Sequence, residues 1–393
     1  MILVINCGSS SLKYELYDMP EGMSRGRGMV ERIGLEMGSI TQKSPDGELY
    51  RRELEVGDHR AAMRLVFEAL DQLIDTMDDI QGVGHRVVHG GEQYSTSMVI
   101  DHKVLAAIQE NIPLAPLHNP ANLTGIREAS ALFPHLKQIA VFDTAFHQTI
   151  SSAAYLYGLP REFYETYKIR RYGFHGTSHR FVNIAAVQYM KRAVENTHTI
   201  SCHLGNGASI TAIAGGKSVD TSMGFTPLEG LVMGTRCGDI DPAIIFFLLE
   251  QGYTAEALNT ILNKKSGMYG LSGISSDFRD LEAALAAGNT LVDEALDVYA
   301  HRVRHYIGAY MAELIKVDLL VFTGGIGEND IAMRERICNR LENLGIIIDR
   351  EKNRENGSQL GVISTDYSPL TVLVVPTNEE LQIAIDTHQL ISA

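Results

Sequence analysis

The chain has 393 residues and a formal net charge of −14 at pH 7, a length that allows one to three domains with a sizeable core. Acidic residues are spread along the whole sequence, which argues against a nucleic-acid-binding surface. The four cysteines are far apart and form no C-x-x-C pair, so we expect reduced thiols. We recognise no signal peptide and no apolar run of the roughly 18 to 20 residues that span a bilayer, and therefore expect a cytoplasmic protein.

The first turn of the chain has the composition of a phosphate-binding hairpin. An apolar run at residues 2–5 predicts a buried strand, and the alternation over residues 12–17 predicts a half-buried strand. Gly8, three serines and Lys13 supply approachable N–H groups, hydroxyls and one cation. The alternative interpretation is a serine-rich surface hairpin without a ligand.

Strands and helices follow in alternation. We expect strands at residues 28–33, 39–43, 48–56, 82–89 and 138–142, and helices at residues 60–77, 104–109 and 119–132. This order is typical of one α/β unit.

A similar order returns in the second half of the chain. We expect strands at residues 199–204, 210–214, 217–221, 319–322 and 372–375, and helices at residues 242–250, 255–262, 276–287, 289–316, 330–341 and 378–390. The repeated strand–turn–strand unit indicates an internal duplication, with a nucleotide in the cleft between two similar lobes.

Two arginines flanked by small residues are candidates for anion binding. Arg86 ends a predicted strand beside glycines, and Arg236 lies between Gly234 and Gly238. An arginine that an anion can reach binds it bidentately, although an ordinary ion pair remains the alternative. His175 lies in a polar turn, and we expect Thr177 to cap the helix that follows.

Carboxylates follow two predicted strands at their carboxyl ends, where α/β sheets place ligand-binding groups. They are Asp143, Glu379 and Glu380. A Mg²⁺ ion held by one or two protein oxygens, waters and a substrate phosphate suits such groups. The glycine turn at residues 323–329 opens a predicted helix, whose N-terminus favours a phosphate. Together these features indicate phosphoryl transfer by positioning and charge neutralisation.

From end to end the sequence resembles the acetate kinases of the acetokinase family. The resemblance rests on residues 6–13, 84–91, 115–120, 142–147, 171–179, 203–207, 226–239, 275–280, 323–329 and 376–380. It implies an α/β fold of two duplicated actin-like ATPase domains, with mixed five-stranded sheets and flanking helices around a nucleotide cleft. The first domain would comprise residues 1–148 and 379–393, and the second, residues 149–378, would bind the nucleotide and form a homodimer.

The resemblance implies reversible transfer of a phosphoryl group from ATP to acetate, giving ADP and acetyl phosphate, with Mg²⁺ or in its place Mn²⁺. It assigns the metal to Asn6 and Glu379, with Glu380 left open, and the carboxylate of acetate to Arg86. It assigns the transferring phosphoryl group to His175 and Arg236. The remaining implied roles are ATP phosphate binding by Lys13, an active-site acid at Asp143, nucleotide binding by His203, Leu204, Gly205, Asn206, Gly207, Asp277, Phe278, Arg279, Gly325, Ile326, Gly327, Glu328 and Asn329, and a pocket for the acetate methyl group formed by Val88, Leu117, Phe174 and Pro227.

Acetate is ionised at pH 7, because carboxyl groups titrate near pH 4. No base is needed to activate it, so we expect Asp143 to orient Arg86 or a metal-bound water. Two residues depart from the family pattern, Tyr14 in place of phenylalanine and Cys237 in place of serine. Cys237 suggests sensitivity to thiol oxidation.

Two alternatives remain open. The first is a propionate kinase, because one methylene contributes only about 0.8 kcal/mol of burial and the sequence does not define the depth of the pocket. The second is an actin-like nucleotide clamp, which would need no arginine pair and histidine directed at an acceptor. The apolar helix at residues 289–316 is a candidate dimer surface, although burial in the core explains it equally well.

Overall fold

The computed structural model describes residues 1–116 and 118–393, apart from the side chains of residues 48 and 49. The chain forms two compact units, Met1–Gln148 with Asn378–Ala393, and Thr149–Thr377. The predicted domains differ from these units by assigning residue 378 to the second. Across the part of the chain that is described, no helix is long and apolar enough to cross a membrane.

An eight-stranded sheet forms the centre of the first unit, in the order β5-β4-β3-β2-β1-β6-β8-β7. Strands β1, β6 and β8 are parallel, and the other pairings are antiparallel. The strands are β1 Ile2–Cys7, β2 Ser11–Asp18, β3 Met23–Glu31, β4 Gly38–Ser44, β5 Gly47–Leu54, β6 Gly82–Val87, β7 Met98–Val99 and β8 Lys137–Phe142.

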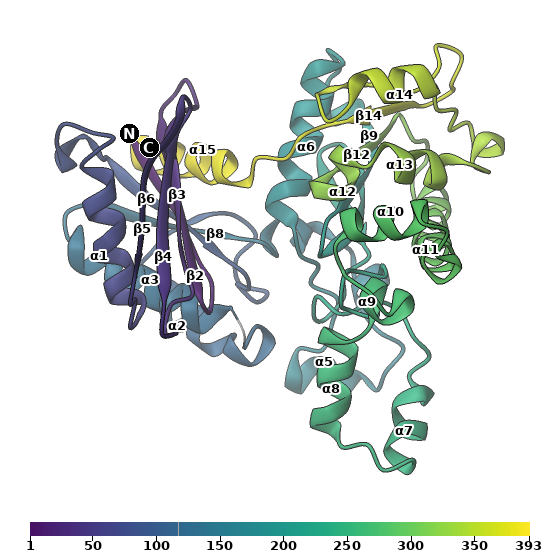
Figure 1. Cartoon of the computed structure of the whole chain (residues 1–393), viewed down its shortest axis with the longest axis horizontal. Coiled ribbons are helices and arrows are strands. Elements are labelled where there is room, and N and C mark those ends of the chain that lie inside the picture. The colour runs from purple at the N-terminus through teal and green to yellow at the C-terminus, as the bar shows by residue number, and fades with distance from the viewer. Residues whose placement is uncertain (117) are drawn as a thin grey trace. The chain divides into compact units, whose positions relative to one another are not determined.

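Helices cover both faces of this sheet (Figure 1). They are α1 His59–Leu70, α2 His102–Glu110, α3 Asn119–Leu132 and α15 Glu379–Ser392. Because successive strand residues point to opposite faces, Leu3 and Ile5 of β1 pack with α1 and α3, whereas Ile2 and Val4 pack with α15. The sheet is therefore buried on both sides around β1.

The second unit has a six-stranded sheet in the order β11-β10-β9-β12-β14-β13, with β9, β12 and β14 parallel. Its strands are β9 His198–Leu204, β10 Ala208–Ala214, β11 Lys217–Thr221, β12 Leu319–Thr323, β13 Gly361–Val362 and β14 Thr371–Val374. The helices are α4 Ser152–Tyr155, α5 Arg161–Tyr167, α6 Gly176–Tyr189, α7 Ala243–Glu250, α8 Ala255–Lys264, α9 Gly267–Ser272, α10 Phe278–Ala286, α11 Thr290–Glu313, α12 Gly324–Asn329, α13 Ile331–Cys338 and α14 Arg350–Asn356.

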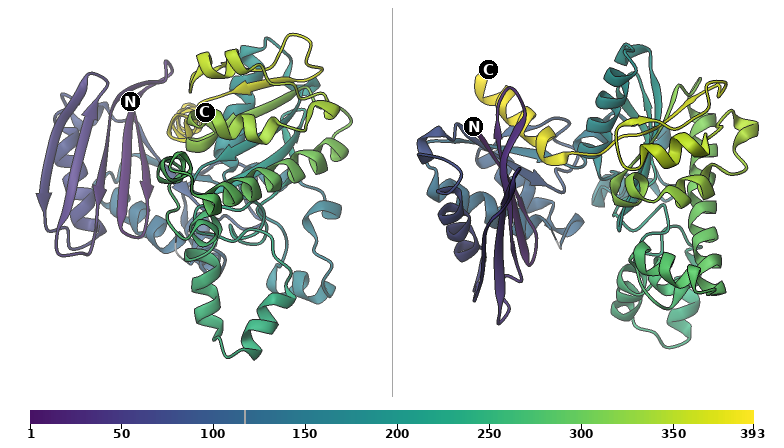
Figure 2. Two further views of the ribbon diagram at one scale, coloured as in Figure 1. Left: turned by 45° about the vertical axis from the view of Figure 1, so that its right-hand side comes forward. Right: turned by 45° about the horizontal axis from the view of Figure 1, so that its top comes forward.

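Helix α6 packs its apolar side on β12 and β14, while α11 contacts β9 and β10 (Figure 2). Short 3₁₀ helices complete the chain at η1 Met77–Asp79, η2 Ile112–Leu114, η3 Ala145–Thr149, η4 Val194–Asn196 and η5 Glu342–Leu344. The predicted helix at residues 60–77 is wrong in length, because α1 ends at Leu70 and Thr76 caps the separate turn η1.

The two sheets share one topology, which confirms the predicted duplication. In each, an antiparallel hairpin leads into three parallel strands and an antiparallel edge strand, so that β3-β2-β1-β6-β8-β7 corresponds to β11-β10-β9-β12-β14-β13. The predicted five strands per sheet are wrong. An edge strand extends each sheet, and the hairpin β4–β5 extends the first further, because the antiparallel pairing of β3 with β4 adds it to the sheet.

Candidate active site

Polar residues lie at the carboxyl ends of three neighbouring parallel strands in the first unit. Asn6 lies near the end of β1, Arg86 near the end of β6, and Asp143 directly after β8. The guanidinium of Arg86 donates from Nη2 to Asp143 Oδ2 at 2.7 Å and from Nε to Oδ1 at 3.1 Å. Asp143 is buried, so this pair fixes the direction of Arg86.

Glu379 joins this cluster from α15. Asn378 caps the helix by accepting the N–H of Leu381, and Glu379 Oε2 then lies 3.8 Å from Arg86 Nε. Burial raises the pKa of Glu379 to about 7; Arg86 opposes the shift and Asp143 adds to it. The carboxylate is thus incompletely compensated by Arg86 alone, and a divalent cation would lower its pKa.

The donor set of the cluster suits Mg²⁺ better than a transition metal, because it offers carboxylate and amide oxygens. Within residues 1–116 and 118–393, no group of three or more His, Cys, Asp or Glu side chains is arranged to hold a metal ion. Mg²⁺ does not require such a group, since it commonly keeps several waters and binds substrate phosphate. Asn6 and Glu379 therefore fit the predicted metal site, which remains a prediction.

Lys13 stands opposite Asn6 in the antiparallel register of β1 and β2. The turn between these strands is closed by the N–H of Gly8, which donates to the carbonyl of Ser11 at 2.8 Å. Lys13, Ser9 and Ser10 are exposed. The hairpin thus presents one cation and two hydroxyls to solvent, as a phosphate-binding turn requires.

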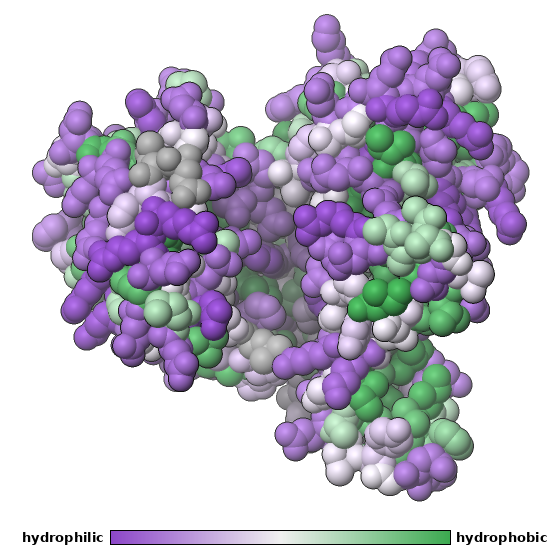
Figure 3. All heavy atoms as spheres, viewed as in Figure 1, coloured by the Kyte–Doolittle hydropathy of each residue, from purple (hydrophilic) through white to green (hydrophobic). Residues whose placement is uncertain are grey.

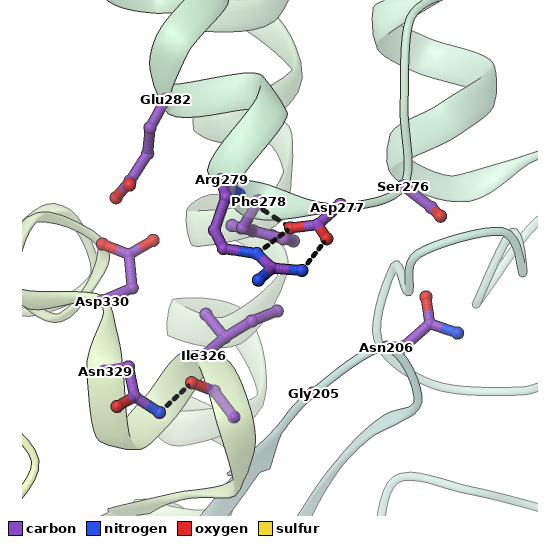
Figure 4. Close-up of a pocket in the computed structure, with 11 residues that line it drawn as sticks. Gly205, Asn206, Ser276, Asp277, Phe278, Arg279, Glu282, Ile326, Asn329 and Asp330 are labelled. Atoms are coloured by element: carbon purple, nitrogen blue, oxygen red, sulfur yellow. Dashed lines mark hydrogen bonds and ion pairs between the residues drawn. The ribbon is translucent and has the colours of Figure 1, made fainter. Parts of the chain in front are cut away.

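The second unit contains a pocket of about 670 Å³ between α10, α12 and the loop after β9 (Figure 4). The predicted nucleotide residues that line it are Gly205, Asn206, Asp277, Phe278, Arg279, Gly325, Ile326 and Asn329. The volume and the mixed apolar and polar lining are typical of a small-molecule site.

Five predicted nucleotide residues do not line this pocket. Leu204, His203 and Gly207 belong to β9 or the loop after it, and Gly327 and Glu328 belong to α12. Glu328 Oε1 accepts the N–H groups of Gly324 and Thr377 at 2.9 and 3.0 Å. This carboxylate therefore supports the start of α12 rather than lining the pocket.

Sequence reasoning missed three residues that line the pocket, namely Ser276, Glu282 and Asp330. Glu282 lies one helical turn beyond Phe278, so helical spacing could have found it. Asp330 caps α13 by accepting the N–H of Met333 at 2.7 Å. In Figure 4, Glu282 and Asp330 face each other at one end of the pocket, and Gly205 and Asn206 lie toward the other.

His175 and Arg236 both lie against Gly207. A Cβ atom added to Gly207 would be 2.8 Å from Arg236 Nη2 and 3.5 Å from His175 Nε2. Arg236 donates from Nη1 to the carbonyl of Pro227 at 2.7 Å, and burial lowers its pKa. Among the described residues no carboxylate forms an ion pair with Arg236, so its charge is available to an anion.

The expected cap at Thr177 is wrong. His175 has φ 56° and occupies the N-cap position of α6, while Thr177 is buried inside the first helical turn. Gly173, with φ 75°, and His175 turn the chain into the helix earlier than a threonine cap would. This left-handed position directs the imidazole of His175 onto that of His203, with ring centroids 4.3 Å apart.

Comparison with known proteins decides the family. Residues 1–385 match the model of the acetokinase family. The chain belongs to the acetokinase family. It is 54% identical to an acetate kinase of Treponema denticola, over 99% of both chains, and 53% identical to one of Alkaliphilus metalliredigens, over 99% of this chain and 100% of that protein. The predicted family is therefore confirmed.

Solved structures agree with this membership. A crystal structure of Porphyromonas gingivalis acetate kinase superposes with a TM-score of 0.96 at 45% identity, covering 99% of both chains. A propionate kinase from Francisella tularensis gives a TM-score of 0.93 at 41% identity, again over 99% of both chains. The predicted duplicated α/β fold is thus shared with acetokinases of known structure.

The residues predicted for the acetate methyl pocket of the acetokinase belong to two different units, which are described separately. Val88 is buried in the first unit, where its N–H donates to Asn122 Oδ1 at 3.1 Å. Phe174, which is buried, and Pro227 belong to the second unit. Leu117 lies outside the described residues. The pocket therefore remains a prediction.

The structure shows the surroundings of Tyr14 and Cys237, the two residues that depart from the acetokinase pattern. The hydroxyl of Tyr14 donates to Gln42 Oε1 at 2.7 Å in the core, and its ring lies over Gly28, where a Cβ would clash with it. The thiol of Cys237 is half-buried, and burial raises its pKa. A raised pKa lowers the thiolate fraction, which argues against the expected sensitivity to oxidation.

Proposed function

We propose that this acetokinase transfers a phosphoryl group reversibly from ATP to acetate, giving ADP and acetyl phosphate. The proposal rests on one observation: Arg236 and His175 lie against Gly207. Gly207 follows Gly205 and Asn206, two residues that line the pocket. Relatives named acetate kinase that are more than 50% identical over 99% of the chain support acetate as the acceptor.

Each group has a role that follows from its chemistry. A carboxylate oxygen of acetate attacks the γ-phosphorus in line, and the bond from phosphorus to the β,γ-bridging oxygen breaks, leaving ADP. Arg236 and His175 stabilise the charge of the transferring group. Arg86 binds the acetate carboxylate. Mg²⁺, held by Asn6 and Glu379, would neutralise phosphate charge when bound.

Asp143 acts by holding Arg86. Its two oxygens engage Nε and Nη2 of the guanidinium, so the group is oriented before acetate arrives. Since acetate is already an anion at pH 7, the reaction contains no proton for Asp143 to remove. This role is that of a positioning residue for the arginine.

Propionate is the second candidate acceptor, because a propionate kinase of known structure is 41% identical to the chain. One extra methylene changes binding by only about 0.8 kcal/mol, so a small difference in the pocket decides between the two acids. The higher identity to proteins named acetate kinase favours acetate.

The test is turnover of Mg²⁺-ATP with acetate, propionate and butyrate, trapping the acyl phosphate with hydroxylamine. We expect the highest kcat/KM with acetate and a loss of at least about 100-fold in Arg86→Gln. Arg60→Gln is the matched control, because Arg60 forms an exposed ion pair with Glu128 in the same unit. A preference for propionate would change the acceptor, and ATP hydrolysis without acyl phosphate would overturn the proposal.

We also infer a homodimer formed through α7. The residues of α7 are all at least partly exposed, including Phe246 at 67% and Phe247 at 59%. Figure 3 shows apolar side chains gathered at this end of the second unit. The predicted surface on residues 289–316 is less suitable, because Val292, Leu296 and other apolar residues of α11 are buried within the unit.

A further inference from the structure

A chain of hydrogen bonds runs from His175 into the core of the second unit. His175 Nδ1 lies 3.0 Å from Ser209 Oγ, and Ser209 Oγ lies 2.8 Å from His179 Nε2. His179 Nδ1 in turn lies 2.9 Å from Ser201 Oγ. Ser209, His179 and Ser201 are completely buried.

The fold positions these four side chains, and none of them lines the nucleotide pocket. His175 is the N-cap of α6, and its carbonyl accepts the backbone N–H of His179 at 2.9 Å, so the first turn of the helix holds the two residues close together. Ser201 and Ser209 belong to the adjacent strands β9 and β10. The helix and the two strands thus hold each of the four side chains within hydrogen-bonding distance of the next.

The single hydroxyl proton of Ser209 links the two imidazoles. When Ser209 donates to His175 Nδ1, its oxygen accepts the Nε2–H of His179, and His179 Nδ1 then accepts the hydroxyl proton of Ser201. Neutral His175 then carries its proton on Nε2, the nitrogen that lies against Gly207 beside Arg236. In the reverse arrangement, neutral His175 would carry its proton on Nδ1 and present a lone pair at Nε2.

We propose that Ser209, His179 and Ser201 are positioning residues that hold the imidazole of His175 with its Nε2–H directed at the transferring phosphoryl group. This inference rests on the proposed function for the identity of that group. The relay supplies a hydrogen-bond donor whose direction is set before the nucleotide binds, which is how preorganised sites lower a barrier.

The direct test is the tautomer of each histidine, measured by ¹⁵N NMR on the full chain labelled at histidine. We expect the Nε2–H form of both His175 and His179 when these rings are neutral. An Nδ1–H form of neutral His175 would overturn the proposal. The NMR measurement requires no turnover. If the protein made no acetyl phosphate, the proposed function would be disproved, but the measured tautomers would still confirm or contradict the hydrogen-bond arrangement.

Kinetics of matched variants provide the second readout. In Ser209→Ala we expect kcat to fall roughly 10- to 100-fold, with KM for ATP and acetate changed by less than about threefold, because the ring loses direction while the binding residues remain. Ser209→Thr keeps the hydroxyl and should restore most of the rate. Ser201→Ala removes the far end of the relay and should shift the His179 tautomer signals.

Thr199→Val is the control variant. Thr199 lies on β9 two residues before Ser201, and among the described residues its buried Oγ1 has no hydrogen-bond partner. We expect wild-type kcat and tautomers in this variant. A Ser209→Ala protein that loses thermal stability but keeps the wild-type kcat and His175 tautomer would show a merely structural role and overturn the proposal.

Discussion

Arg86 and Asp143 form a constrained charged pair in the first unit, because one carboxylate spans two nitrogens of the guanidinium. In Asp143→Asn, one oxygen of this pair becomes an NH₂ group that cannot accept a hydrogen bond. We predict that kcat/KM for acetate falls roughly 100-fold, with no new pH dependence between pH 6 and 8. Steady-state kinetics across that range check this.

Asp58→Asn is the control for this substitution. Asp58 caps α1 by accepting the N–H of Ala61 at 2.8 Å, and asparagine caps helices equally well. Wild-type kinetics are expected. Should Asp143→Asn retain its metal affinity while its activity acquires a new titration, Asp143 would be a proton-transfer group and the orienting role would be wrong.

Gly207 matters because it leaves room for Arg236 and His175. The methyl group of Gly207→Ala would lie 2.8 Å from Arg236 Nη2, closer than unbonded atoms approach, so the guanidinium must move. We predict a loss of kcat of roughly 10- to 100-fold with little change in thermal stability, because the strain falls on one side chain. Kinetics and a thermal melt measure the two effects separately.

Gly308→Ala tests whether any glycine substitution is harmful. Gly308 lies within α11, and nothing lies within 4 Å of a Cβ added there. Alanine should keep full activity and stabilise the helix by about 0.5 to 1 kcal/mol. Full activity in Gly207→Ala would show that Arg236 is not confined at this point.

The strands could be predicted from the sequence, but the strands with which each of them pairs could not. Apolar runs and alternation identified β1, β2, β9 and β10, because side-chain periodicity is a local property. The addition of β4 and β5 to the first sheet depends on pairing between strands, which the sequence alone does not define. Residue patterns identified Arg86, Asp143 and Glu379 as site candidates, whereas only the resemblance supplied Asn6 as a metal ligand and residues 277–279 as nucleotide-binding residues.

The relay around His175 was missed for a similar reason. His179 and Ser209 are 30 residues apart and come from a helix and a strand, so no spacing in the sequence connects them. The left-handed backbone of His175 was also unexpected, because φ > 0 is uncommon for residues other than glycine. The contact between His179 and Ser209 joins α6 to β10, so it depends on tertiary packing and not on local preference.

The pair formed by His85 of β6 and Gln138 of β8 predicts that the free energy of unfolding depends on pH. His85 Nε2 lies 2.6 Å from Gln138 Oε1, and burial lowers the pKa of His85 to about 4, although this hydrogen bond opposes the shift. Between about pH 6.5 and 4 the unfolded chain binds a proton there that the folded chain does not. Stability is therefore lost as the pH falls through this window, by about 3 kcal/mol in total.

The measurement is the urea midpoint of wild type and of His85→Leu with Gln138→Leu between pH 4.5 and 7.5. The double variant removes the titrating group and its partner together, so no buried polar atom of this pair remains. We predict that the urea midpoint of the wild type falls relative to that of the variant as the pH decreases. Parallel curves would show that His85 is not the group responsible.

For the whole molecule, the apolar surface of α7 predicts the association state. Exposed apolar side chains are normal when scattered, but Ile244, Phe246, Phe247 and Leu249 lie together on one eight-residue helix. A stable dimer buries about 800 Å² on each partner, and such an interface gains most from aromatic residues at its centre. We predict a wild-type mass of twice 43.3 kDa by light scattering.

Replacing Phe246 and Phe247 by lysine should shift this mass toward 43.3 kDa, because two ammonium groups would be desolvated at the centre of the interface. Ile315→Lys is the control, since Ile315 is 98% exposed and lies away from α7 in the chain. The charged variant should bind nucleotide as wild type does, because neither phenylalanine lines the pocket. A wild-type mass of 43.3 kDa, or a dimer that persists in the charged variant, would exclude α7 as the interface.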